Sequence, residues 1–202
     1  MKGEAGPAPG LTAVVEALLF AAARPLTVAE LAEAAEADSR EEVRHALTLL
    51  AERLQATGSA LELVEVAGGW RLQTRPPFAP WIKRLLRRAP RRMSRAALET
   101  LALIAYRQPI TRAEIEAVRG VDSSGTIRFL LDQGLVRMAG RKEAVGRPIL
   151  YATTRRFLEL FQLKDLKELP SPRELEELEA HSGQEALPLF GVANQGRKES
   201  GR

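Results

Sequence analysis

Few side chains in this sequence of 202 residues are of the types that do catalytic or metal chemistry. There is no cysteine, which excludes disulfides, thiolate zinc sites and a cysteine nucleophile. The two histidines, His45 and His181, lie far apart, and a lone helical histidine is more often a surface or packed residue than a catalytic base. Carboxylate pairs such as Glu114 and Glu116 are typical of solvated helix faces. We therefore predict a protein that is not an enzyme and that holds no metal and no cofactor.

The sequence is also rich in Lys and Arg, whose side chains can bind phosphates, and these cations are concentrated in one short stretch. Residues 81–95 carry seven basic and no acidic side chains, whereas residues 1–80 carry seven basic and eleven acidic ones. One interpretation is a solvated linker between two domains. The other is a weak contact with DNA phosphates that is independent of base sequence. The side chains that would make this contact are Arg87, Arg88, Arg91 and Arg92.

An internal repeat shows which elements must position these residues. The segment Pro25–Leu31 reappears as Pro109–Ile115, shifted by 84 positions, and the same shift places Val43 on Ile127 without a gap. The apolar residues keep the same phase across three successive helical patterns. The sequence therefore predicts two copies of one domain.

In the first copy, apolar spacing predicts an amphipathic helix over Leu11–Ala23 that stops before Pro25. A short second helix is expected after Thr27, with Glu30 completing a capping box. The third helix is expected from Asp38-Ser39 to about Thr57. Alternation over Leu61–Val66, a Gly68-Gly69 turn and a returning strand then predict a hairpin, so that each copy is a winged helix.

The second copy repeats this order. Its expected elements are helices at Arg95–Tyr106, Thr111–Val118 and Ser123–Gln133, wing strands at Leu135–Met138 and Ile149–Thr153, and a further helix at Arg155–Leu163. The fold class is α+β, mainly helical, with tandem winged-helix (helix-turn-helix) domains and small β-hairpin wings. The expected division is a disordered tail (1–10), a first domain (11–80), a basic linker (81–92), a second domain (93–163) and a mostly disordered tail (164–202).

The run Met93–Val121, MSRAALETLALIAYRQPITRAEIEAVRGV, resembles the signature of the bacterial segregation and condensation protein B family, ScpB. Gly146–Thr154, Phe157-Leu158 and Gly68–Leu72 are similar to its other marks, while Ala23-Arg24 departs from its pattern. The resemblance implies a homodimer, formed through the first domain, that binds the kleisin subunit ScpA. Through ScpA it would join the SMC ATPase in chromosome condensation and partition during cell division.

The expected location is the cytoplasm, in association with the nucleoid. The longest apolar run, Ala17–Ala23, has seven residues, far short of the roughly 18 to 20 that a membrane-spanning helix needs. We expect no membrane association.

The alternative is a winged-helix transcriptional regulator that reads DNA. A groove-reading helix presents Arg, Lys, Asn or Gln to the base edges. In the third helix of the second copy Arg128 is the one basic residue, and Glu41, Glu42 and Glu52 in the first copy would face phosphate with like charge. Direct readout is therefore disfavoured in both copies.

Candidate contact residues follow from the resemblance and from side chains that exceed what small cores need. For the kleisin they are Arg107, Gln108, Phe129, Arg147 and Tyr151. Two interpretations remain open for two of these residues: Tyr151 borders a peptide groove or is a core residue of the wing strand, and Arg147 borders the same groove or belongs to a turn that fixes the wing geometry. For the dimer, the candidates are the apolar residues Leu11, Leu18 and Phe20 of the first helix.

Overall fold

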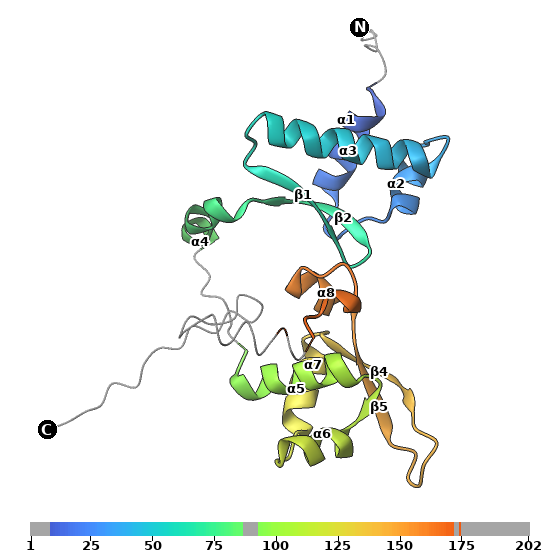
Figure 1. The fold of residues 1–202 in the computed structure, drawn as a ribbon, viewed down its shortest axis with the longest axis vertical. Coiled ribbons are helices and arrows are strands. Elements are labelled where there is room, and N and C mark those ends of the chain that lie inside the picture. Colours follow the sequence, from blue (N-terminus) through green and yellow to red (C-terminus); the bar gives the residue numbers. More distant parts are fainter. Residues whose placement is uncertain (1–8, 87–92, 172–173, 175–202) are drawn as a thin grey trace, which may run out of the picture. The chain divides into compact units, whose positions relative to one another are not determined.

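The structure is a computed structural model that describes residues 9–86, 93–171 and 174. It divides into two compact units, Met1–Ala89 and Pro90–Arg202, which we call unit 1 and unit 2 (Figure 1). Each unit contains three helices followed by a β-hairpin, the winged-helix order that the repeat predicts.

Unit 1 begins with three helices, of which the second and third start at side-chain caps, Thr27 and Ser39. They are α1 (Leu11–Ala21), α2 (Val28–Ala34) and α3 (Arg40–Ala56). The predicted capping box is confirmed, because the Thr27 hydroxyl accepts from the Glu30 amide while the Glu30 carboxylate accepts from the Thr27 amide. Helix α1 ends two residues earlier than predicted, since Ala22 already has extended backbone.

The wing of unit 1 is the antiparallel pair β1 (Leu61–Val66) and β2 (Gly69–Thr74). Its turn lies one residue earlier than predicted: Ala67 and Gly68, with φ of 52° and 68°, are the two central residues, and Gly69 pairs with Val66. One face of the hairpin packs on the helices. The core there consists of Val15, Leu19, Leu31, Val43, Ala46, Leu47, Leu50 and Leu54, with Leu61, Leu63, Trp70 and Leu72 against it.

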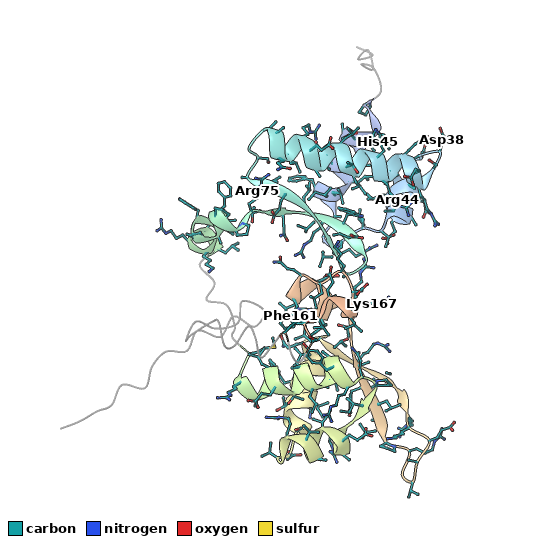
Figure 2. The ribbon with its side chains drawn as sticks, viewed as in Figure 1. Asp38, Arg44, His45, Arg75, Phe161 and Lys167 are labelled. Carbon is teal, nitrogen blue, oxygen red and sulfur yellow. The ribbon has the colours of Figure 1, made fainter. Side chains whose placement is uncertain are left out.

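The chain after this wing differs from the expected linker. A 3-10 turn, η1 (Pro76–Phe78), leads into helix α4 (Ala79–Leu86). Arg75 anchors the exit from the hairpin by donating to the carbonyl oxygens of Leu61 and Leu54, at 3.3 and 3.2 Å (Figure 2). Within the described part of unit 1, α4 packs mainly against η1.

Unit 2 repeats the architecture with a larger sheet. Its elements are α5 (Arg95–Arg107), β3 (Ile110–Thr111), α6 (Arg112–Arg119), α7 (Ser124–Asp132), β4 (Val136–Arg141), β5 (Ile149–Thr153), α8 (Arg155–Phe161) and η2 (Leu166–Glu168). The strand order is β3-β5-β4, all antiparallel. Unit 1 has a bridge in the same place, Leu26 with Trp70, and Leu26 is the repeat equivalent of Ile110.

The core of unit 2 is completed by residues that follow the wing. Phe157 and Leu163 are buried with Leu101, Ile104, Ile115 and Leu130, and Leu169 packs against them. The Tyr106 hydroxyl donates to the Pro170 carbonyl at 2.6 Å. Residues 164–170 were expected as the start of a disordered tail. Of these, Leu169 and Pro170 contact unit 2, whereas residues 164–168 are exposed.

Candidate partner interface

The corner between α5 and β5 is tied together by Gln108. Its amide nitrogen donates to the Ala105 carbonyl at 3.1 Å. Its amide oxygen accepts from the backbone N–H and the hydroxyl of Thr153, at 2.7 and 2.9 Å. Gln108 was predicted as a kleisin contact because packing gave no reason for it. The structure supplies that reason, since its amide joins the end of α5 to the end of β5.

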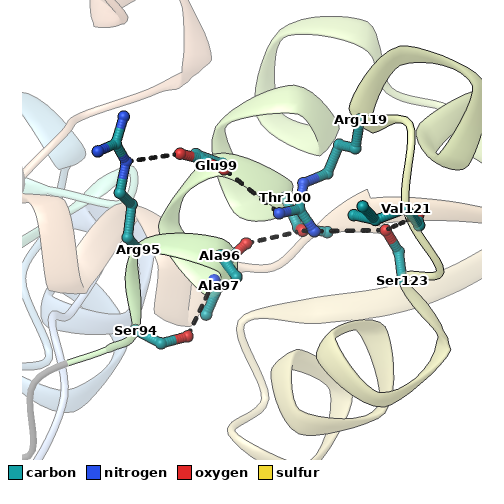
Figure 3. A network of polar contacts seen from close by, with 9 residues as sticks. All are labelled: Ser94, Arg95, Ala96, Ala97, Glu99, Thr100, Arg119, Val121 and Ser123. Carbon is teal, nitrogen blue, oxygen red and sulfur yellow. Dashed lines mark hydrogen bonds and ion pairs between the residues drawn. The ribbon is translucent and has the colours of Figure 1, made fainter.

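A second polar network holds the α6–α7 connection against α5 (Figure 3). The largely buried Arg119 guanidinium donates to the Thr100 hydroxyl at 2.9 Å and to Glu99 at 3.2 Å. Thr100 donates in turn to the Ala96 carbonyl. The pKa of Glu99 is lowered, first by its hydrogen bond with Arg95 and then by the one with Arg119. Arg119 also donates to the hydroxyl of Ser123, the N-cap residue of α7, at 3.4 Å, which ties the start of α7 to α5.

The wing of unit 2 is fastened to α6 by one carboxylate. Glu114 accepts from the Lys142 ammonium at 2.6 Å and from the backbone N–H and hydroxyl of Thr111. These hydrogen bonds, with the one from Lys142 the strongest, lower the pKa of Glu114 from 4.5 to about 2. The wing loop is further closed by Arg141, which donates to the Arg147 carbonyl at 3.0 Å. The outward side of the wing is therefore held in a defined position relative to α6.

The predicted kleisin residues are spread over unit 2. Arg107 is exposed at the end of α5, Phe129 is 40% exposed on α7, and Arg147 is exposed in the wing loop with a φ of 40°. Tyr151 is only 9% exposed and belongs to the core, because β5 is the central strand and Tyr151 stands between Ile110 and Met138. Of the two interpretations of Tyr151, the structure supports the core residue and contradicts the groove-lining one.

Sequence reasoning missed several exposed apolar side chains of unit 2. They are Val118, Val121, Met138 and Leu160. Val118 and Val121 flank Gly120, the left-handed cap of α6, so the glycine was a local signal that the helix ends there and that its neighbours face solvent. Nothing in the apolar pattern alone separates them from core positions.

The dimer candidates on α1 fall into two kinds. Leu11 and Leu18 are half-buried against the unit 1 core, whereas Phe20 is 79% exposed. Phe20 is therefore the candidate with apolar surface to offer a partner. The candidate DNA contacts Arg87, Arg88, Arg91 and Arg92 lie outside the described residues.

The third helices carry little that would read DNA. Glu41, Glu42 and Glu52 are exposed on α3, and Arg128 is the one basic residue of α7. His45 is also exposed on α3 (Figure 2). Over residues 9–86 and 93–171, no group of three His, Asp or Glu side chains is arranged to hold a metal. In the same part of the chain, no helix is long and apolar enough to cross a membrane.

The fold defines a tandem winged-helix protein. Its third helices offer few cations for base readout, because Arg128 is the one basic residue of α7, and on α3 Arg44 and Arg53 are paired with Glu41 and Glu16. A sequence model of the family described as "Segregation and condensation complex subunit ScpB" matches residues 13–172. The chain belongs to this family.

Two relatives are identical to it at about half of the aligned residues. Segregation and condensation protein B of Syntrophotalea carbinolica is 50% identical over 172 residues, 85% of this chain and 87% of that protein. The protein of the same description from Myxococcus xanthus is 51% identical over 82% of this chain and 50% of its own length.

Two crystal structures are also similar. ScpB from Mycobacterium tuberculosis is 42% identical, covering 74% of this chain and 92% of that one, with a TM-score of 0.36. A dimer of the ScpB N-terminal domain complexed with ScpA peptide is 33% identical, covering 37% of this chain and 91% of that one, with a TM-score of 0.35.

Proposed function

We propose that this chain is the dimeric, ScpA-binding subunit of an SMC–kleisin complex and that it acts in chromosome condensation and partition. The observation that carries the proposal is the family match, which spans both units from residue 13 to residue 172. A relative's N-terminal domain has been crystallised as a dimer complexed with ScpA peptide, which supports the same two partners here. The SMC ATPase would be reached through ScpA, as the family resemblance implies.

The protein works by binding rather than by catalysis, and its place is the nucleoid in the cytoplasm. Support for the first statement comes from the polar networks of unit 2, which consist of side chains already engaged in helix caps and strand contacts. Glu99, Glu114 and Arg119 each bond to structural partners within the unit. Support for the second is that a condensation subunit acts on the chromosome.

To unit 2 we assign a further ScpA contact, in addition to the one that the relative's N-terminal domain complex supports for unit 1, through exposed side chains that the core of unit 2 does not need. Phe129 on α7, Arg107 at the end of α5 and Arg147 in the wing offer the aromatic and arginine anchors that dominate protein interfaces. Base readout is disfavoured by the same surface, because Arg128 is the one cation on α7.

The test is calorimetric titration of ScpA from the same organism into the full chain, with the mass of the complex measured by light scattering. We expect Phe129→Ala and Arg147→Glu each to weaken binding by about 30-fold, the equivalent of about 2 kcal/mol for a central anchor. The melting temperature should change little, because both side chains are exposed. Tyr151→Ala serves as the contrast, since it should lower the melting temperature instead.

Val145→Ala is the matched control, because Val145 is fully exposed at the wing tip, away from the helices of unit 2. Full-affinity binding by Phe129→Ala and Arg147→Glu would remove this surface from the ScpA contact. Absence of any complex between ScpA and the unaltered chain would contradict the proposed function itself.

A further inference from the structure

Helix α4 carries an apolar surface that its own unit leaves uncovered. We call it the α4 face, and it consists of Phe78, Trp81, Leu85 and Leu86. Steps of three and four residues place Phe78, at the end of η1, Trp81 and Leu85 on one side, and Leu86 lies beside Leu85. Trp81, Leu85 and Leu86 are 63%, 80% and 60% exposed. Figure 1 shows α4 at the end of β2, standing apart from α1, α2 and α3.

The charge around the α4 face restricts what can cover it. Residues 76–95 contain no acidic side chain, and Lys83 and Arg84 lie on α4 itself. The occupant must therefore offer apolar and acidic groups together. Duplex DNA offers phosphate charge but no apolar surface for Trp81 and Leu85. Pairing α4 with a second α4 would bring like charges together, which is unfavourable.

The remainder of unit 1 has the complementary character. Residues 1–75 carry an excess of acidic side chains, and Glu16, the charged residue of α1, is paired with Arg53 of α3. The same helix displays Phe20, which together with Leu85 is one of the two most exposed large apolar side chains in the described part of unit 1. Each of these two residues lacks apolar contacts that the other could provide.

We propose that the α4 face of one copy packs on α1 around Phe20 in a second copy, and that the exchange is reciprocal. In a two-fold dimer a contact from α4 to α1 is made twice, so a short helix contributes twice its own area. This inference rests on the proposed dimer and identifies α4 as the helix that contributes to its interface. It explains why α4 is connected to unit 1 but not packed on it.

Disulfide trapping tests the contact directly, because the sequence has no cysteine. Full chains carrying Leu85→Cys and Phe20→Cys are mixed and oxidised with copper phenanthroline, and the covalent dimer is read on a non-reducing gel. We expect efficient coupling between these two positions, which requires their Cα atoms to approach within about 7 Å. Val145→Cys mixed with Phe20→Cys is the control and should not couple.

A mass measurement keeps the test independent of disulfide geometry. Light scattering at several concentrations compares the unaltered chain with the double variant Trp81→Ser and Leu85→Ser and with the exposed control Val145→Ser. We expect the dimer dissociation constant to rise by at least about 30-fold in the double variant only. Both variants should keep the unaltered ellipticity, since all three side chains are exposed.

Three results would overturn the inference, and they differ from one another. A chain that is monomeric at all concentrations contradicts the proposed dimer as well. A dimer unaffected by the α4 variants, without coupling between Leu85→Cys and Phe20→Cys, removes α4 from the interface and leaves the dimer standing. If in that case Trp81 fluorescence of a Trp70→Phe chain shifts to the blue with ScpA or with phosphatidylglycerol vesicles, that molecule covers α4 instead.

Discussion

The two units build the same winged helix and differ in the helix that follows the wing. In unit 2, α8 packs on the core. Phe157 is buried there, and its ring centroid lies 4.8 Å from that of Phe161. In unit 1, α4 keeps Trp81 and Leu85 in solvent. A helix with similar apolar content thus completes one unit and leaves the other with an uncovered surface. Unit 1 thus leaves the helix after its wing exposed, and our proposal places a second copy of the chain on that surface.

A second difference lies in the repeated capping box. Glu30 and Glu114 occupy equivalent positions, and in both the pKa falls from 4.5 to about 2. The leading cause is Arg24 for Glu30 and Lys142 for Glu114. Arg24 is a neighbour in sequence, whereas Lys142 comes from the wing. The same cap therefore only closes a helix in unit 1, but in unit 2 it also holds the wing.

The largest expected effect tests the contrast between α8 and α4. Phe157→Ala should lower the free energy of unfolding of unit 2 by about 3 to 5 kcal/mol, because it empties a buried aromatic site. Leu85→Ala should change the stability of monomeric chain by less than about 0.5 kcal/mol. Guanidinium unfolding followed by circular dichroism measures both. Equal losses would mean that α4 is packed as well as α8.

The next effect tests whether the units unfold separately. Leu31 and Ile115 are equivalent residues and both are fully buried. Leu31→Ala and Ile115→Ala should each cost about 2 to 5 kcal/mol, in its own unit only. Both tryptophans, Trp70 and Trp81, lie in unit 1, so their fluorescence reports that unit alone.

We expect Leu31→Ala to shift the fluorescence transition and Ile115→Ala to leave it unchanged while shifting part of the ellipticity transition. A fluorescence transition that shifts equally in both variants would show that the two units unfold together, and it would contradict their independence.

A smaller effect separates two neighbouring candidates at the α5 corner. Gln108→Ala should destabilise unit 2 by about 1 to 3 kcal/mol, because the Thr153 amide loses its acceptor. Arg107→Ala should leave the melting temperature nearly unchanged, because the side chain is exposed. Thermal melts of both variants, with ScpA titration alongside, check this. A large loss of stability in Arg107→Ala would assign it a structural role instead.

The smallest effect concerns the capping carboxylates and pH. A carboxylate whose pKa is lowered on folding contributes stability above its ordinary pKa of 4.5 and loses it as the pH falls toward 2. Glu114→Gln should therefore melt below the unaltered chain at pH 7, with the gap closing between about pH 5 and pH 2. Lys142→Ala should reduce that gap, whereas Arg24→Ala should not. A gap that is constant with pH would contradict the ionic contact.

The sequence predicted the features that depend on neighbouring residues. The cap at Thr27 is confirmed, since it needs only a carboxylate three residues on, and Thr111 with Glu114 repeats it in unit 2. Tyr151 could not be placed, because its burial depends on β3 and β4 closing on both sides of β5. Helix α4 was missed because its cations suggested a solvated linker, although its apolar spacing at Trp81 and Leu85 was a helical signal.

Gln108 shows that the role of a candidate site residue, too, could not be predicted from the sequence alone. Its type suggested an interface residue, but its amide is used by Ala105 and Thr153, and Thr153 lies 45 residues away. Contacts of this kind depend on the tertiary fold and leave no local pattern. Phe129 and Arg147 are exposed, as an interface requires, and their role remains a prediction.

The central claim is that unit 1 joins two copies of the chain and unit 2 binds ScpA. The most direct test is the mass of the complex with ScpA, measured by light scattering at one concentration. Three proteins are compared: the unaltered chain, the double variant that carries both Trp81→Ser and Leu85→Ser, and the Phe129→Ala variant. The account predicts two copies of the chain with ScpA for the unaltered protein, single copies that still bind ScpA for the α4 variant, and a dimer that binds ScpA about 30-fold more weakly for Phe129→Ala. A single copy of the unaltered chain with ScpA would contradict it.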